Sequence, residues 1–290
     1  MAIIRSLPIR KTIAAVLRRW WFLVLIVLAQ LVPSFASRGY RIQDWGAVNA
    51  YILTHTIKSS AAGFFPLFQV IALALCVALF LVGQRMGRFF SAFVAVSYFV
   101  VAFLQNISVS DRYGLAVCSA NVIVFLGLAG LWFREAAAPK NRFEVQARPA
   151  WRYWPLLPAI LAFWEPINPT TLGPDFNPVY LLTSGAALSF CLATPLYLAV
   201  LCIHFPQVNK TVLIATAFTG ALMAFGNLVL EFVILPDYWW IGILHIPLLI
   251  LSCYAILLSY NGLAAGLDGV LIQESTSQVT GLDRQDARSS

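Results

Sequence analysis

Apolar residues are grouped along the chain in blocks of about 20, with short polar stretches between them. A helix of that length rises 1.5 Å per residue and crosses roughly 30 Å, the thickness of the hydrocarbon layer of a bilayer. The blocks lack the two-residue alternation over about 10 residues that marks a membrane β-barrel. The pattern therefore predicts an all-α protein, a polytopic transmembrane helical bundle of about eight spans. The expected spans cover residues 20–35, 64–82, 89–107, 115–133, 154–164, 179–205, 211–235 and 240–260.

Two of these spans carry features that interrupt a regular helix. The fifth is short, because Glu165 is followed by Pro166 and Pro169, and the loop after it is either external or partly re-entrant. Pro195 predicts a kink in the sixth span. The first segment has two interpretations, a membrane span or a cleaved signal peptide ending near Ala36, and a polytopic protein can use its first span as the signal.

The polar stretches divide the chain into two groups of four spans. Within the first group, Trp45, Val48 and Ile52 recur at helical spacing, which predicts either a short helix on the membrane surface or a loop folded over the bundle. Whether the two halves are a true repeat stays open. The expected divisions are a basic N-terminus (1–19), a first half (20–133) with an outer interfacial segment (38–63), a basic linker (134–153), a second half (154–262) and a polar tail expected to be disordered (263–290).

Basic residues are distributed unevenly between the two sides of this bundle. Only 11% of the 290 residues are charged, against about 25% in soluble domains, and the net charge is +7. With eight spans, 15 of the 19 Lys and Arg residues fall on the side of the termini. The positive-inside rule then places both termini in the cytoplasm, in a cytoplasmic (plasma) membrane. The expected partner of this charge is membrane lipid and not nucleic acid.

The sequence offers no motif for a metal or a cofactor. All five cysteines fall inside expected spans or at their ends and form no CxxC pair, which is typical of packing residues. The chain contains no GxxxxGK[ST], GxGxxG or HExxH motif. We therefore expect no metal site and no cofactor.

A few polar residues inside the apolar blocks are the candidate binding site. Glu231 continues a stripe of Gly220, Ala224 and Asn227, whose spacing of three and four residues places them on one helix face. His245 is the ionisable side chain of the following span. A carboxylate near the bilayer is unfavourable unless a proton, an imidazole or a bound cation compensates it. We therefore predict that Glu231, His245, Asn227 and Glu165 bind or couple a small solute or cation near the outer side; the alternative is that each merely reaches water or a neighbouring helix.

Three functions remain open at this point. The first is a carrier of a small solute or ion, supported by inward-facing polar residues and interrupted helices. The second is a membrane enzyme acting on a lipid or isoprenoid, with Glu231 or Glu165 as general acid or base. The third is a non-catalytic subunit of a membrane complex. The sequence leaves the substrate and the oligomeric state undetermined.

Overall fold

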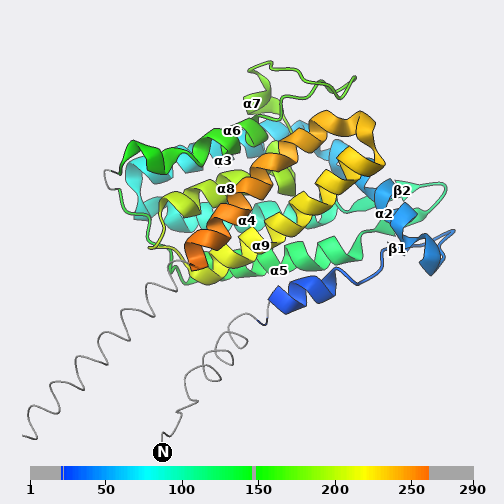
Figure 1. Cartoon of the computed structure of the whole chain (residues 1–290), viewed down its shortest axis with the longest axis horizontal. Helices are drawn as coiled ribbons and strands as arrows, with labels where there is room; N and C mark the ends of the chain where they lie inside the picture. The colour runs from blue at the N-terminus through cyan, green and yellow to red at the C-terminus, as the bar shows by residue number, and fades with distance from the viewer. Residues whose placement is uncertain (1–20, 22, 146–147, 261–290) are drawn as a thin grey trace, which may run out of the picture.

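The computed structural model describes residues 21, 23–145 and 148–260. In this part of the chain, helices run back and forth along one axis, and a small sheet lies at one end of the bundle (Figure 1). The predicted basic N-terminus and polar tail lie outside the described residues. Residues 21 and 23–29 of the first expected span are helical, but they adjoin residues outside that range.

Helices make up most of the described chain. The α-helices with assigned bounds are α2 (Trp45–Thr54), α3 (Phe65–Val82), α4 (Gln84–Leu104), α5 (Ser119–Ala137), α6 (Leu156–Trp164), α7 (Tyr180–Thr183), α8 (Phe190–Ile203) and α9 (Lys210–Val229). Residues 239–260 form a further helix. Shorter 3-10 segments are η1 (Ile42–Asp44), η2 (Ile57–Phe64), η3 (Ala150–Tyr153), η4 (Ala186–Leu188) and η6 (Pro236–Tyr238), and η5 (Leu230–Ile234) is a π-helical turn.

Within the described residues, five helical segments are long and apolar enough to cross a bilayer, so the predicted eight spans are confirmed only in part. A sixth is added if two helices that meet at 98° count as one span. The fifth expected span falls short because α6 has only 9 residues. The five segments are Ile42–Val82, Gln84–Leu104, Ser119–Ala137, Lys210–Ile234 and Pro236–Tyr260, and the bent pair is Tyr180–Leu188 with Phe190–Ile203.

A three-stranded antiparallel sheet corrects the all-α prediction. Its strands, in the order β1-β3-β2, are β1 (Phe35–Ala36), β2 (Ile107–Ser110) and β3 (Gly114–Val117). The hairpin of β2 and β3 takes up residues assigned to the ends of the third and fourth spans, so α4 ends at Leu104 and α5 begins at Ser119. Gly114 allows the turn because its φ is +62° and an added Cβ would lie 2.2 Å from the Ser37 hydroxyl.

The expected helix of segment 38–63 is present as α2, and it packs against this sheet. Val48 and Ile52 are fully buried, whereas Trp45 is exposed. The contacts of α2 are with β2 and β3, and its placement at a membrane surface stays a prediction. The small core shared by α2 and the sheet consists of Ala36, Val48, Ile52, Tyr113, Ala116 and Cys118.

Helix α8 is the centre of the bundle, since all its residues are buried. A helix that is apolar all round is expected at such a position. It packs against α6, α9 and α4. The Tyr98 and Thr194 hydroxyls lie 3.1 Å apart, and the Tyr197 hydroxyl donates to Ser97 at 3.2 Å. These buried hydroxyl pairs fix the register of α4 on α8, because a slip would leave polar groups unpaired.

The sharp bend of the sixth segment lies before α8 and not at Pro195, which is inside α8. Gln69 of α3 holds the bend in place. Its side-chain amide donates to the Phe163 carbonyl at 2.8 Å and to the Ser184 hydroxyl at 3.0 Å, and its Oε1 accepts from the Ala187 amide at 2.9 Å. A fully buried glutamine thus satisfies backbone groups that a continuous helix would have paired internally.

Candidate functional site

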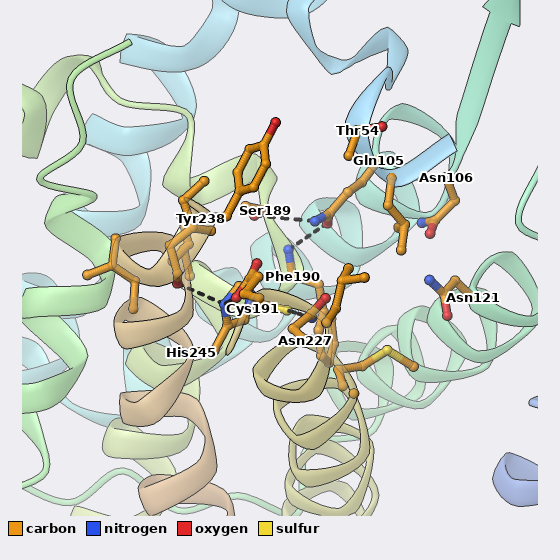
Figure 2. A pocket seen from close by; sticks show the side chains of 18 of the residues that line it. Thr54, Gln105, Asn106, Asn121, Ser189, Phe190, Cys191, Asn227, Tyr238 and His245 are labelled. Carbon is orange, nitrogen blue, oxygen red and sulfur yellow. Dashed lines mark hydrogen bonds and ion pairs between the residues drawn. The ribbon is translucent and has the colours of Figure 1, made fainter. Parts of the chain in front are cut away.

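The ends of several helices meet beside the sheet around a half-open cavity of about 970 Å³. The cavity is lined by α2, by residues just after α4 and α6, by the first turns of α5 and α8, by the last turns of α9 and by the start of helix 239–260. Its rim includes exposed side chains such as Trp45 and Ile234, and its inner wall includes buried ones such as Phe190. Figure 2 shows side chains from these elements converging on one space.

All four predicted site residues line this one cavity: Glu231, His245, Asn227 and Glu165. Their approach could not be read from the sequence alone, because it depends on how α6, α9 and the last helix pack. The structure therefore gathers the candidate residues into one place, while their role stays a proposal.

Glu231 and His245 form a buried pair. Oε2 of Glu231 lies 2.9 Å from Nδ1 of His245, and the two side chains are only 10% and 9% exposed. Nδ1 also lies 3.0 Å from the Ile241 carbonyl oxygen. Nδ1 thus lies within hydrogen-bond distance of two oxygens, the Ile241 carbonyl and the Glu231 carboxylate, and which of them it serves depends on the tautomer of the ring.

Glu231 lies on a π-helical turn at the end of α9. The Leu235 amide donates to the Leu230 carbonyl at 2.7 Å, which is the i to i−5 bond of a π-helix. Such turns re-aim side chains and are frequent at functional sites. The predicted stripe faces inward above this turn, where Ala224 is fully buried and Gly220 lies against Ser252.

Cys191 is a member of the site that sequence reasoning missed. It was interpreted as a packing residue, and it is indeed 5% exposed, but it also lines the cavity. The Asn227 side-chain amide donates to its Sγ at 3.3 Å, and the thiol also interacts with the His245 ring. Figure 2 shows the three side chains next to one another. Only the packing of α8 against α9 and the last helix reveals this group.

Glu165 ends α6, as its two following prolines predict. Its φ of 53° is left-handed, an unusual conformation for a residue with a side chain. Its Oε2 is buried without a hydrogen-bond partner in the described chain. The Trp240 indole donates to the Pro166 carbonyl at 2.7 Å and so ties the chain after α6 to the last helix. Beyond that point, the loop projects from the bundle beside α7 (Figure 1).

A second polar group lies on the opposite wall, at the end of α4. Gln105 accepts from the Phe190 amide at 2.9 Å and thereby caps the start of α8. Asn106 is fully buried, and its amide nitrogen donates to the Val101 and Ala102 carbonyls at 3.2 and 3.3 Å. Its Oδ1 has no donor among the described residues. Figure 2 places Gln105, Asn106 and Asn121 across the cavity from His245.

Charges of both signs lie at the cavity. Among the described residues that line it, the acids are Glu165 and Glu231. His245 lies beside Glu231, and the Lys58 ammonium lies 5.4 Å from the ring centroid of Phe65, a further lining residue. Within the described residues, no group of three His, Cys, Asp or Glu side chains could hold a metal ion. The site is thus a cavity with two carboxylates, apolar walls and a lysine at its edge.

Comparison of the chain with protein-family models, with curated proteins and with solved structures finds no match in any of the three. The length and apolar composition of the helices are those of an integral membrane protein.

Proposed function

We propose that the protein is a carrier that moves a small solute across a membrane, with Glu231 and His245 at the centre of its binding site. The observation that carries this proposal is the cavity of about 970 Å³ that is lined by a buried carboxylate–imidazole pair, with Oε2 of Glu231 2.9 Å from Nδ1 of His245. A charge at the bilayer centre is unfavourable by on the order of 3 kcal/mol, and ionisable groups inside membrane bundles are therefore rare and commonly functional.

The surrounding architecture supports transport. Helix α6 stops at Glu165, α9 ends in a π-turn at Glu231, and the segment before α8 bends by 98°. Carriers commonly build their sites from interrupted helices, because backbone ends then face the ligand and can shift between two arrangements. Because the basic residues are biased toward the side of the termini, we propose that both termini are cytoplasmic and that the cavity lies at the outer face of the cytoplasmic membrane.

The pair supplies a coupling device for such a carrier. Glu231 and His245 can together gain or lose a proton, because Oε2 of the carboxylate lies 2.9 Å from Nδ1 of the imidazole. That proton changes the net charge of the pair, and with it the free energy of moving the site between two arrangements of the bundle. Asn227 and Cys191 hold the neighbouring wall in place.

A membrane enzyme is the second candidate, because Cys191, His245 and Glu231 lie together. A thiol beside an imidazole that is itself beside a carboxylate is the arrangement of an activated nucleophile. A non-catalytic subunit has less support, since it requires no internal cavity.

Flux into proteoliposomes tests the carrier. Glu231→Gln keeps the size of the side chain but removes its charge, and we expect it to reduce uptake of a transported solute at least tenfold while the protein still reconstitutes. The control is Asp111→Asn, which removes a charge from an exposed turn at the same end of the bundle. Equal uptake by Glu231→Gln and wild type would contradict the proposal. New lipid products in the wild-type vesicles, seen by mass spectrometry without flux, would favour the enzyme instead.

A further inference from the structure

Two helices long and apolar enough to cross a bilayer, α5 and α9, pack together at the end of the bundle away from the sheet and separate toward the cavity (Figure 1). Where they pack, the Trp132 indole of α5 donates to the Thr216 hydroxyl of α9 at 3.1 Å. Asn121 and Asn227 lie on the same two helix faces, about three turns closer to the sheet, and both line the cavity. The contact between the two helices is therefore replaced by the cavity within about 16 Å along their axes.

Gly226 lies at the rim of the cavity on the α9 side. It lines the cavity, is exposed, and has nothing within 4 Å of an added Cβ. Its neighbour Phe225 is 65% exposed, so the outer surface of α9 begins directly beside this rim. Leu222 and Ile234 also line the cavity, and the helix between them rises about 18 Å, more than half of the roughly 30 Å of hydrocarbon in a bilayer. In the described part of the chain, the cavity thus opens sideways between two spans, at the depth of lipid tails.

The walls that a ligand can reach through this opening are apolar. Leu222, Met223 and Leu230 of α9 line the cavity and are partly exposed, as is Leu53 of α2. Water gains no hydrogen bonds from such walls, and apolar cavities in proteins stay dry or bind apolar molecules. A space of this kind that is connected to the bilayer therefore favours a hydrocarbon chain as its occupant.

Uncharged polar groups are also within reach of a ligand. The Asn121 amide and the Tyr238 phenol line the cavity, make no hydrogen bond within the described chain and are not sealed from solvent. Because charges of both signs lie at the cavity, they select neither an anion nor a cation. Amide and phenol groups both donate and accept hydrogen bonds, and hydroxyl or ester groups on a ligand match them without any charge.

We propose that a single-chain lipid with an uncharged polar head, of the monoacylglycerol or monoalkylglycerol class, enters the cavity from the bilayer between α5 and α9. Its chain lies along Leu222, Met223 and Leu230, and its head lies toward Asn121 and Tyr238. This inference names the solute class of the proposed carrier and rests on that function for movement across the membrane, whereas binding alone requires no flux.

Photocrosslinking tests the proposal on the full chain reconstituted into phosphatidylcholine nanodiscs. The probes are hexadecylglycerol, hexadecyl phosphate and hexadecylammonium, each with the same diazirine in its chain. We expect the glycerol probe to label peptides within residues 119–125 and 222–230 about tenfold more than either charged probe, and unlabelled hexadecylglycerol to compete this labelling away. Equal labelling by the three probes, labelling confined to other peptides, or labelling without competition would overturn the proposal.

A matched pair of glycine variants tests the opening itself. Gly226→Trp places a large ring at the rim, where there is space for it, and should lower labelling of the cavity peptides about tenfold. Gly127→Trp is the control, because Gly127 is exposed on α5, has nothing within 4 Å of an added Cβ and lies outside the cavity lining. It should be labelled as wild type is. Unchanged labelling of a folded Gly226→Trp protein would refute the opening between the helices, and the competition in wild type decides the binding if that variant does not fold.

Labelling and flux separate this inference from the proposed carrier. Competed labelling of the cavity without uptake of any solute would leave the inference standing and reject the carrier. Uptake of a water-soluble solute that depends on Glu231, without labelling of the cavity, would do the reverse.

Discussion

His204 is a titratable residue buried at the end of the bundle away from the cavity. It lies just past α8, outside the candidate spans, and is 3% exposed. Its Nδ1 lies 2.8 Å from the Val200 carbonyl, and its ring packs edge-on against Phe143 at 5.1 Å. Burial lowers the pKa of His204 from its ordinary 6.5 to about 4, although the Val200 carbonyl opposes that change. The folded protein therefore keeps this ring neutral at pH values where the unfolded chain protonates it.

The consequence is a loss of stability on acidification. Between pH 6.5 and 4 the unfolded chain binds a proton that the folded protein excludes, so the free energy of unfolding falls as the pH falls. At pH 5 the loss attributable to His204 is about 2 kcal/mol. Thermal unfolding in detergent at pH 7 and pH 5 measures it. His204→Gln, which does not titrate, should show a smaller decrease than wild type, and equal decreases would show that His204 contributes nothing.

Single residues also show where sequence reasoning reaches its limit. Glu231 and His245 stand out in the sequence because each interrupts a long apolar block, and polarity in such a block is visible without a structure. Cys191 and Asn106 do not stand out in this way. Their importance depends on neighbours from other helices, on Asn227 for the thiol and on an absent donor for the amide oxygen.

Helix α9 and the helix over residues 239–260 approach each other closely at Gly220. A Cβ added at Gly220 would lie 2.4 Å from the Ser252 hydroxyl and 3.0 Å from Leu248 Cδ1. Small residues at such crossings allow helices to pack tightly inside a bilayer, where no hydrophobic force holds them together. The spacing of the stripe on α9 predicted this inward face, and the contacts of Gly220 confirm it.

A pair of glycines on the same helix tests that packing. Gly220→Ala should lower the free energy of unfolding by about 1–3 kcal/mol, because the two helices must separate to admit the methyl group. Gly226→Ala is the control, since nothing lies within 4 Å of its added Cβ and alanine favours a helix by up to about 1 kcal/mol. Thermal unfolding of both variants decides the matter. A Gly220→Ala protein as stable as Gly226→Ala would mean that this crossing can relax freely.

Helices and strands were predictable where the local hydropathy pattern determines them, and were not predictable where contacts between distant residues determine them. The second expected span matches α3 within one residue at its start, because a continuous apolar block of this length predicts a single long helix. The bend before α8 depends on Gln69 of α3, which is more than 100 residues from its partner Ala187 in the sequence. The sheet likewise pairs β1 with β3, which lies some 80 residues later. The hydropathy pattern along the chain predicts neither of these contacts.

The whole molecule has two chemically different ends. The cavity, α2 and the sheet lie at one end, and the linker after α5 packs on the turns of the other. There, Glu135 accepts from the Lys140 and Asn141 amides at 2.6 Å each and from the Asn209 side-chain amide at 2.6 Å. Residues 134–153 are thus a packed cap and not a free linker in their described part. The described basic residues of the cap end are Arg85, Arg88, Arg134, Lys140, Arg142, Arg148, Arg152 and Lys210, against Arg38, Arg41, Lys58 and Arg112 at the cavity end.

This asymmetry predicts which end faces the cytoplasm, since basic residues are retained on the cytoplasmic side. Single cysteines at the two ends can report it in a Cys253→Ser background, because Cys253 is the exposed native cysteine and the other four are buried. Asp111→Cys, in the turn between β2 and β3, should react with a membrane-impermeant maleimide in intact cells. Lys140→Cys should react only after the membrane is permeabilised. The reverse pattern would place the cavity on the cytoplasmic side, so the proposed carrier would bind its solute from inside the cell. Labelling of both sites in intact cells would mean that the helices between them do not cross the bilayer.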